Sequence, residues 1–148
     1  MQRTKIEWTD YDLGWLSALI DGEGCICLLK EKRLNQKAGC QYKPRLSIGN
    51  KNLNLLRKAQ SLMGEAIIGP GKNDVYELQV SANNMRRVLP VIKLIVKEGQ
   101  RNLIIHALNL LKKRHRGRGN PMTQKEIDIF EAIYMNIRAL NGKVWSKK

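Results

Sequence analysis

The chain has 148 residues, with 27 Lys and Arg against 13 Asp and Glu, which gives a formal net charge of +14. This length suits one domain, and a hydrophobic content of 43% is enough for a core, so wholesale disorder is excluded. We expect neither a membrane span nor a secretory signal, because the chain lacks an apolar run of about 18 residues and its start lacks an apolar segment. Three cysteines cannot form a closed disulfide framework, which favours an intracellular, reducing compartment: a bacterial or archaeal cytoplasm, a mitochondrion or a chloroplast.

The positive charge is spread unevenly along the chain. Residues 25–64 hold nine basic residues and a single acid, Glu31, and residues 93–148 hold thirteen basic residues against four acids. Residues 1–24, by contrast, hold five acids and two basic residues. Long basic blocks are typical of surfaces that lie along nucleic-acid phosphates, and the acidic N-terminal segment would fit a metal cation held between protein and phosphate.

Periodicity predicts an α-β-β-α-β-β-α-α-α order. The first helix is expected over residues 10–21 with Thr9 as its N-cap, followed by strands over 25–30 and 41–49 and a helix over 50–63. Two short strands, 67–68 and 75–80, flank a turn at 69–74. Three helices complete the chain: one from Asn83 or Asn84 to about Val96, one over 100–114, and one opened by the capping box Thr123 to Glu126 and ending near residue 140. A basic linker is expected at 115–121.

This order predicts an α+β fold in one domain, 1–148, with a core of about 10–142, in which helices cover one face of an antiparallel sheet. The other face would be polar and basic, and therefore either solvated or a binding surface. Such a twisted ribbon can enter a DNA major groove, where its side chains would read base edges. The residues expected on this face are Gln41, Lys43, Arg45, Ser47, Glu77 and Gln79.

The first helix carries a narrow stripe of small side chains at i, i+3, i+4 and i+7: Gly14, Ser17, Ala18 and Asp21. A smooth stripe allows another helix to approach closely, either within this chain or from a second copy. The helix ends in Asp21-Gly-Glu-Gly24, where unsatisfied carbonyls carry partial negative charge. Glu23 adds further negative charge there, so the segment is either a solvated glycine-rich turn or a cation site.

The segment Leu16-Ser-Ala-Leu-Ile-Asp-Gly-Glu-Gly24 resembles the motif of the LAGLIDADG homing endonucleases. Five positions match outright, Ser17, Ala18 and Gly22 replace small residues by small residues, and Glu23 replaces an acid by an acid. Further similarity lies at 48–56, at Lys97 with 100–103, and at the boundaries of the last helix, so the resemblance covers about 10–142. A single copy of the motif is similar to the homodimeric branch of the family.

The resemblance implies a role for particular residues. Glu23 matches the acid that binds divalent metal, with Mg²⁺ as the expected cofactor, and Gly22 matches a position whose backbone carbonyl assists. Asn50 matches a polar position that organises active-site water, and Lys97 matches a basic residue near the scissile phosphate. The small-residue stripe would form the dimer interface. Arg33, Lys72, Lys112 and Lys113 join the polar strand face as expected DNA contacts.

The leading hypothesis is therefore a homodimeric, Mg²⁺-dependent, site-specific endonuclease that cleaves double-stranded DNA and is encoded by a mobile intron. One alternative is an RNA-binding intron maturase on the same fold, and another is a DNA-binding regulator that has lost catalysis. Glu23 and Lys97 favour the nuclease. The spacing of Cys25, Cys27 and Cys40 fits no common zinc site.

Overall fold

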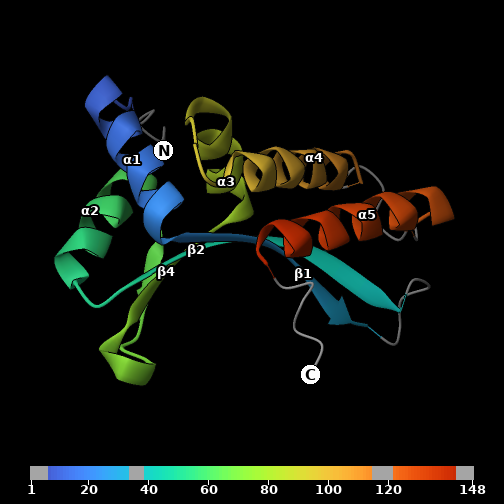
Figure 1. Cartoon of the computed structure of the whole chain (residues 1–148), viewed down its shortest axis with the longest axis horizontal. Coiled ribbons are helices and arrows are strands. Elements are labelled where there is room, and N and C mark those ends of the chain that lie inside the picture. The colour runs from blue at the N-terminus through green and yellow to red at the C-terminus, as the bar shows by residue number, and fades with distance from the viewer. Residues whose placement is uncertain (1–6, 34–38, 115–121, 143–148) are drawn as a thin grey trace, which may run out of the picture. The chain divides into compact units, whose positions relative to one another are not determined.

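The computed structural model describes residues 7–33, 39–114 and 122–142. Its element order is the expected one: α1 (Asp10–Glu23), β1 (Gly24–Lys32), β2 (Cys40–Asn50), α2 (Leu53–Met63), β3 (Ala66–Ile68), β4 (Tyr76–Val80), α3 (Ala82–Val88), α4 (Glu98–Arg114) and α5 (Gln124–Leu140) (Figure 1). Two short 3₁₀ turns, Lys72–Asp74 and Leu89–Val91, complete it. None of the helices in these ranges is long and apolar enough to cross a bilayer.

The four strands form one sheet in the order β1-β2-β4-β3. Strand β4 pairs antiparallel with β2 on one side and with β3 on the other. The α+β class is as expected, and the alternating burial of β2 separates its two faces, with Tyr42, Leu46 and Ile48 buried on the same side.

The described residues fall into two compact units. The first unit comprises the residues up to Cys25 together with Leu46–Val96, and the second comprises Ile26–Arg45 together with the residues from Lys97 onward. The boundary lies within β1 and within β2, so each unit contains a part of both strands.

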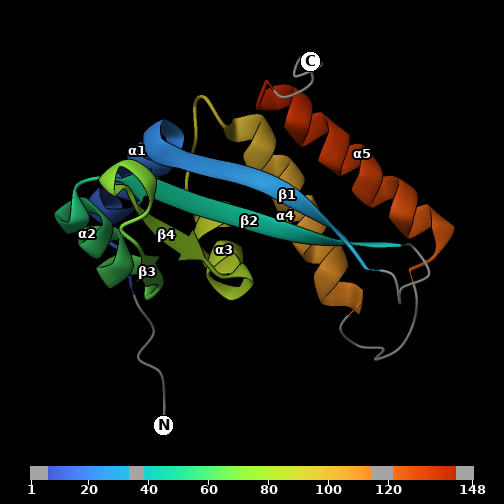
Figure 2. The same cartoon turned by 90° about the horizontal axis from the view of Figure 1, so that it is seen from below.

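In the first unit, α2 packs on β3 and β4 (Figure 2). Its N-cap is Asn52, whose side chain accepts hydrogen bonds from the backbone amides of Asn54 and Leu55, and Gly64 ends it in the left-handed conformation. The core side chains of this unit are fully enclosed: Leu16, Ile20, Leu46, Ile48, Leu56, Met63, Leu78 and Met85.

In the second unit, α4 and α5 run side by side and pack against each other. The expected capping box opens α5, because Thr123 and Glu126 each accept a hydrogen bond from the other residue's backbone amide. Phe130 of α5 stacks on Tyr42 of β2, with ring centroids 5.4 Å apart. Phe130 of α5 therefore helps to bury Tyr42, which is 3% exposed.

The third helix is shorter than the sequence predicts, and its cap differs. Ser81 rather than an asparagine caps α3, because its side chain accepts the hydrogen bond from the Asn84 amide. The helix ends at Val88 instead of continuing to Val96, and a 3₁₀ turn that contains Pro90 follows. Proline has no N–H for the helical hydrogen bond and clashes with the preceding turn, which accounts for the early end. The expected linker at 115–121 lies outside the described residues.

Candidate functional site

The site begins at the C-terminal end of α1, in the first unit. Thr9 and Asp12 form a capping box at the other end, and Leu16 and Ile20 anchor the helix in the core. Gly24 must be glycine, because a Cβ there would lie 2.6 Å from the Ile20 carbonyl oxygen. Gly22 and Glu23 consequently stand at the surface, in a last turn that has no basic residue.

This end of α1 suits a hard cation. The Glu23 carboxylate is exposed at the negative end of the helix dipole, where a positive charge is stabilised. Mg²⁺ prefers oxygen ligands, keeps several waters, and is bound through one or two carboxylates. Glu23 and the Gly22 carbonyl fit that donor set, but they provide only one carboxylate per chain. Among the described residues, no three His, Cys, Asp or Glu side chains are grouped so that they could hold a metal ion.

Asp21 has a defined role within the chain. Its carboxylate accepts hydrogen bonds from the backbone amides of Ile95 and Val96, each with a shortest distance of 2.9 Å. The sequence predicts Asp21 in a dimer interface; within the chain, its carboxylate ties the segment after the 3₁₀ turn to α1. That segment leads directly into Lys97.

Lys97 is half-buried and belongs to the second unit. Its carbonyl accepts the hydrogen bond from the Arg101 amide, so Lys97 immediately precedes the first turn of α4, as expected. A lysine at a helix N-terminus is unfavourable for the helix dipole, and Glu98 in the first turn offsets it.

Asn50 is the last residue of β2, and its side chain carries two polar groups, an oxygen and an NH₂. Its side-chain oxygen accepts a hydrogen bond from the Asn52 amide at 2.8 Å, which shapes the turn into α2. The oxygen is therefore used locally, and the amide NH₂ is the group that remains to hold a water molecule. The sequence places Asn50 among the catalytic residues but gives no sign of this division between its two ends.

The small-residue stripe lies open in the described part of the chain. Gly14 and Ala18 are exposed, and a Cβ added at Gly14 or Gly22 would meet no atom within 4 Å. Ser17 is half-buried, and its hydroxyl donates to the Leu13 carbonyl at 2.6 Å. Of the two interpretations of the stripe, packing within this chain is therefore the weaker.

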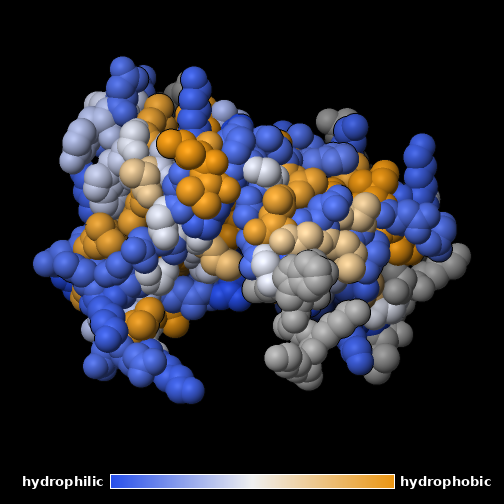
Figure 3. Space-filling view, in the orientation of Figure 1, coloured by the Kyte–Doolittle hydropathy of each residue, from blue (hydrophilic) through white to orange (hydrophobic). Residues whose placement is uncertain are grey.

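Large apolar side chains of the same unit are also exposed. Tyr11 is 71% exposed, Ile95 91% and Val96 74%. The space-filling view shows hydrophobic residues gathered over the part of the molecule that α1 and the segment after α3 occupy (Figure 3). Because Asp21 fixes Ile95 and Val96 to α1, this apolar surface is continuous with the helix that bears the stripe.

The polar strand face is formed largely as the sequence predicts. In the first unit Ser47 is paired with Gln79 and Gly49 with Glu77, while Ile48 and Leu78 lie on the buried side. Gln79 is exposed and Glu77 is half-buried, but Ser47 is only 9% exposed, so it contradicts the expectation of an open position. Lys72 is exposed at the tip of the β3–β4 hairpin, which Figure 3 shows covered by hydrophilic residues.

In the second unit, Lys43 and Arg33 are exposed and Gln41 and Arg45 are half-buried. Strand β1 also has two distinct faces: Ile26 and Leu28 are buried, whereas Cys25, Cys27 and Leu29 are more exposed. Lys112 and Lys113 are exposed in the last turn of α4 rather than in a linker.

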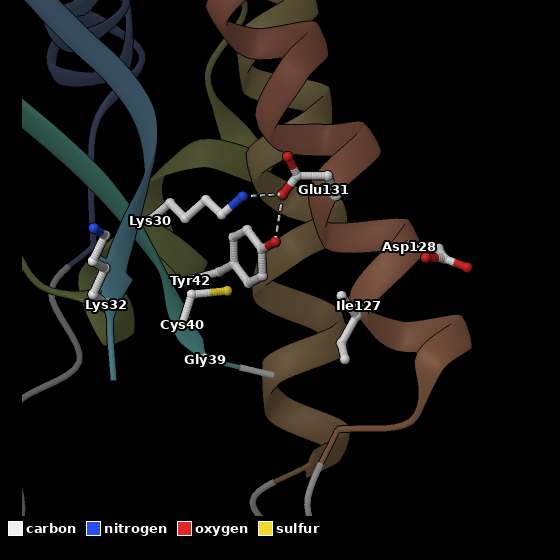
Figure 4. A pocket seen from close by; sticks show the side chains of 8 residues that line it. All are labelled: Lys30, Lys32, Gly39, Cys40, Tyr42, Ile127, Asp128 and Glu131. Carbon is white, nitrogen blue, oxygen red and sulfur yellow. Dashed lines mark hydrogen bonds and ion pairs between the residues drawn. The ribbon is translucent and has the colours of Figure 1, made fainter. Parts of the chain in front are cut away.

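A second cluster, in the second unit, was not predicted from the sequence. Glu131 of α5 accepts hydrogen bonds from the Lys30 ammonium at 2.8 Å and from the Tyr42 hydroxyl at 2.5 Å (Figure 4). The hydrogen bond from Lys30, followed by that from Tyr42, lowers the pKa of Glu131. The hydrogen bond with Glu131 raises the pKa of Lys30. Burial, followed by the hydrogen bond with Glu131, raises the pKa of Tyr42. Glu131 lies 101 positions from Lys30 and 89 from Tyr42 in sequence, so no local pattern could reveal the cluster.

Comparison with known proteins identifies the family. Residues 16–115, about two thirds of the chain, match the family model described as "LAGLIDADG endonuclease". The chain belongs to the LAGLIDADG endonuclease family. No sequence among the curated proteins matches it.

Solved LAGLIDADG structures share its fold. I-SmaMI, a LAGLIDADG homing endonuclease bound to cleaved DNA, is 19% identical with a TM-score of 0.69; the match covers 90% of this chain but only 49% of I-SmaMI. The homing endonuclease I-TnaI is 17% identical with a TM-score of 0.69, and the match covers 88% of this chain and 93% of that one. I-CvuI, in complex with an uncleaved DNA target in the presence of Mg, is 16% identical with a TM-score of 0.63, covering 85% and 79%.

Proposed function

We propose that this protein is a site-specific homing endonuclease that hydrolyses double-stranded DNA with Mg²⁺ as a homodimer on a long pseudo-palindromic target. Membership of the LAGLIDADG family carries the proposal, because the segment that resembles the family's motif contains the exposed Glu23. Three independent properties of the chain support it: its charge of +14, its polar strand face and its open helix stripe. We also propose that it is intron-encoded and works in a reducing compartment, which suits cysteines that form no disulfide within the described ranges.

The residues for metal binding are Glu23 and the carbonyl of Gly22. Bound divalent metal would supply activation of the attacking water and charge stabilisation at the leaving oxygen. I-CvuI has been solved with the I-CreI target in the presence of Mg and with its own target in the presence of Ca, which supports a divalent metal here. Within this chain, the Asn50 amide would hold a water, and the Lys97 ammonium would offset negative charge near the scissile phosphate.

A second copy of the chain would complete the site. One chain offers one carboxylate at the end of α1, and packing two α1 helices through their open stripes would bring two Glu23 side chains to the dyad. A symmetric pair would also provide one nucleolytic centre for each DNA strand. The match covers about half of I-SmaMI but most of I-TnaI.

Each half of the target would lie along the polar strand face. Arginine donates two hydrogen bonds to guanine O6 and N7, and glutamine pairs similarly with adenine, so Arg45, Gln41 and Gln79 are suited to base edges. Lys72, Lys112 and Lys113 are exposed and would contact phosphates, which position the protein without reading sequence.

The test is cleavage of a randomised pool of DNA duplexes, with the cut ends sequenced, by wild-type protein and by Glu23→Gln. Glutamine keeps the shape of glutamate and removes the charge that holds Mg²⁺, so cleavage should be abolished while DNA binding persists. Asp10→Asn, at the exposed opposite end of α1, is the control and should cleave normally. Cleavage by Glu23→Gln within a few-fold of wild type would refute the metal assignment. A wild-type protein that never cuts duplex DNA but binds its intron RNA would support the maturase instead.

A further inference from the structure

Four side chains on the polar face of β1 and β2 are joined in one network, which we name the strand cluster: Glu31, Arg33, Gln41 and Lys43. The Glu31 carboxylate contacts the Arg33 guanidinium at 3.3 Å and the Lys43 ammonium at 3.5 Å. Arg33 Nε also donates to the Gln41 side-chain oxygen at 3.1 Å. All four residues belong to the second unit, so the network lies within one compact body.

Glu31 is an acidic residue in a strongly basic part of the chain. It is the only acid among residues 25–64, which hold nine basic residues, and it contacts two of them at once. Its side chain is 38% exposed, and those of Arg33 and Lys43 are 46% and 48% exposed. Ion pairs this exposed contribute little to stability, so folding alone does not explain an acid in the middle of a basic surface.

The strand cluster holds the two cationic groups without using up their donors. Guanidinium has five N–H groups, of which the network engages one at Nε and one at Nη2. Both hydrogens on Nη1 and one on Nη2 remain, and they suffice for a bidentate pair with a base edge or a phosphate. Lys43 likewise keeps two of its three donors.

We propose that Glu31 is a specificity-determining residue that restrains Arg33 and Lys43 from binding phosphates on arbitrary DNA. This inference rests on the proposed function as a DNA-binding nuclease. Non-specific binding is almost wholly electrostatic, and phosphate contacts carry no sequence information. A carboxylate that partly neutralises both cations lowers that affinity, and by fixing their positions it keeps them set for base edges. Glu31 therefore acts through its two neighbours, as a positioning residue.

The experiment compares wild type with Glu31→Gln on two probes. One is a duplex selected by the wild-type protein from a randomised pool, and the other is a shuffled duplex of the same length and composition. Glu31→Gln should tighten binding to the shuffled duplex, on the order of tenfold at 0.1 M salt for each cation released. The slope of log affinity against log salt should steepen by about 0.9 for each added phosphate contact. Binding to the selected duplex should change less, so the specificity ratio falls.

Two further variants distinguish the loss of the Glu31 charge from the loss of any negative charge on the surface. Asp128→Asn, which removes one negative charge from the exposed surface of α5 in the same unit, should leave the ratio and the salt slope unchanged. Glu31→Asp keeps the negative charge, so its affinity for the shuffled duplex should depend on salt as steeply as that of wild type. Circular dichroism melting of each variant checks that the fold is intact.

A double-mutant cycle provides the decisive measurement. In an Arg33→Gln, Lys43→Gln background, Glu31→Gln has no cation to release, so its effect on the shuffled duplex should disappear. The proposal is overturned if Glu31→Gln changes both probes equally, or if its effect survives in that background. If the wild-type protein selects no duplex at all, the proposed DNA-binding function fails first, and that result is seen without any variant.

Discussion

Glu131 accepts hydrogen bonds from two different elements and so connects α5 to both β1 and β2. Its two partners differ in burial. Lys30 is exposed, and an exposed ion pair contributes about 0–1 kcal/mol. Tyr42 is only 3% exposed and stacks on Phe130, so its hydroxyl depends on Glu131 for a hydrogen bond. The larger share of the stabilisation by Glu131 should therefore come from Tyr42.

Replacing Glu131 by alanine should lower the free energy of unfolding by about 1–3 kcal/mol, because it leaves the buried Tyr42 hydroxyl unsatisfied. In a Tyr42→Phe background the same replacement should cost about 1 kcal/mol or less, since only the exposed pair with Lys30 remains. Urea unfolding of the four proteins measures both values. Equal costs in the two backgrounds would contradict the assigned role of the hydroxyl.

The same residue predicts a pH dependence. The pKa of Glu131 is lowered from its ordinary value of 4.5, chiefly by the hydrogen bond from Lys30 and then by that from Tyr42. A lowered pKa means that the folded state favours the carboxylate, so its contribution is present above pH 4.5 and is lost as the pH falls through the folded-state pKa. The difference in melting temperature between wild type and Glu131→Gln should therefore shrink on acidification below that range. A difference that stays constant from pH 7 to pH 3 would contradict it.

At the scale of elements, α1 does two things with opposite faces. Leu16 and Ile20 are fully enclosed in the first unit, while Gly14 and Ala18 are exposed. A helix face made of small residues allows a second helix to approach closely. The exposed Ile95 and Val96, fixed to α1 by Asp21, add apolar area beside that face.

Enlarging Ala18 to leucine should therefore weaken a homodimer and leave the monomer folded. The added side chain has open space in the single chain but would separate two packed α1 helices, at the 1–3 kcal/mol or more typical of overpacking. Sedimentation of wild type and Ala18→Leu, free and bound to a selected duplex, gives the dissociation constants. A wild-type protein that stays monomeric at micromolar concentration on its DNA would sink this prediction.

The elements could be predicted where their signal is local. The N-cap at Thr9, the capping box at Thr123, the alternation predicted for β2 and the order of the helices and strands in the described residues followed from sequence, since each depends on neighbours a few residues apart. The capping box that Asp12 completes with Thr9 was not predicted. The end of α3 was predicted wrongly because the apolar run to Val96 outweighed Pro90 in the pattern. The contacts of Asp21, Ser47 and Glu131 depend on residues distant in sequence, so periodicity could not show them.

For the whole molecule, we expect the basic residues behind the net charge of +14 to make two kinds of DNA contact. Glu31 and Glu77 lie half-buried on the polar strand face, so base-reading positions there are interspersed with acids. Lys112 and Lys113 are exposed in the last turn of α4. They belong to a helix and not to the strand face that would direct side chains to base edges. We therefore expect the strand face to set specificity and the helix lysines to set overall affinity.

Arg45→Ala should relax the preference at one base pair in each half of the target, because a bidentate arginine–guanine pair is worth about 1–3 kcal/mol of discrimination. Lys112→Ala and Lys113→Ala should instead weaken binding to every sequence alike. Each should reduce the steepness of the salt dependence by about 0.9, because one fewer phosphate counterion is released. The measurement is a binding profile over all single-base variants of a selected duplex, at two salt concentrations. If Arg45→Ala lowers affinity uniformly and leaves the base profile unchanged, the strand face is not the surface that reads DNA, and specificity must come from another part of the molecule.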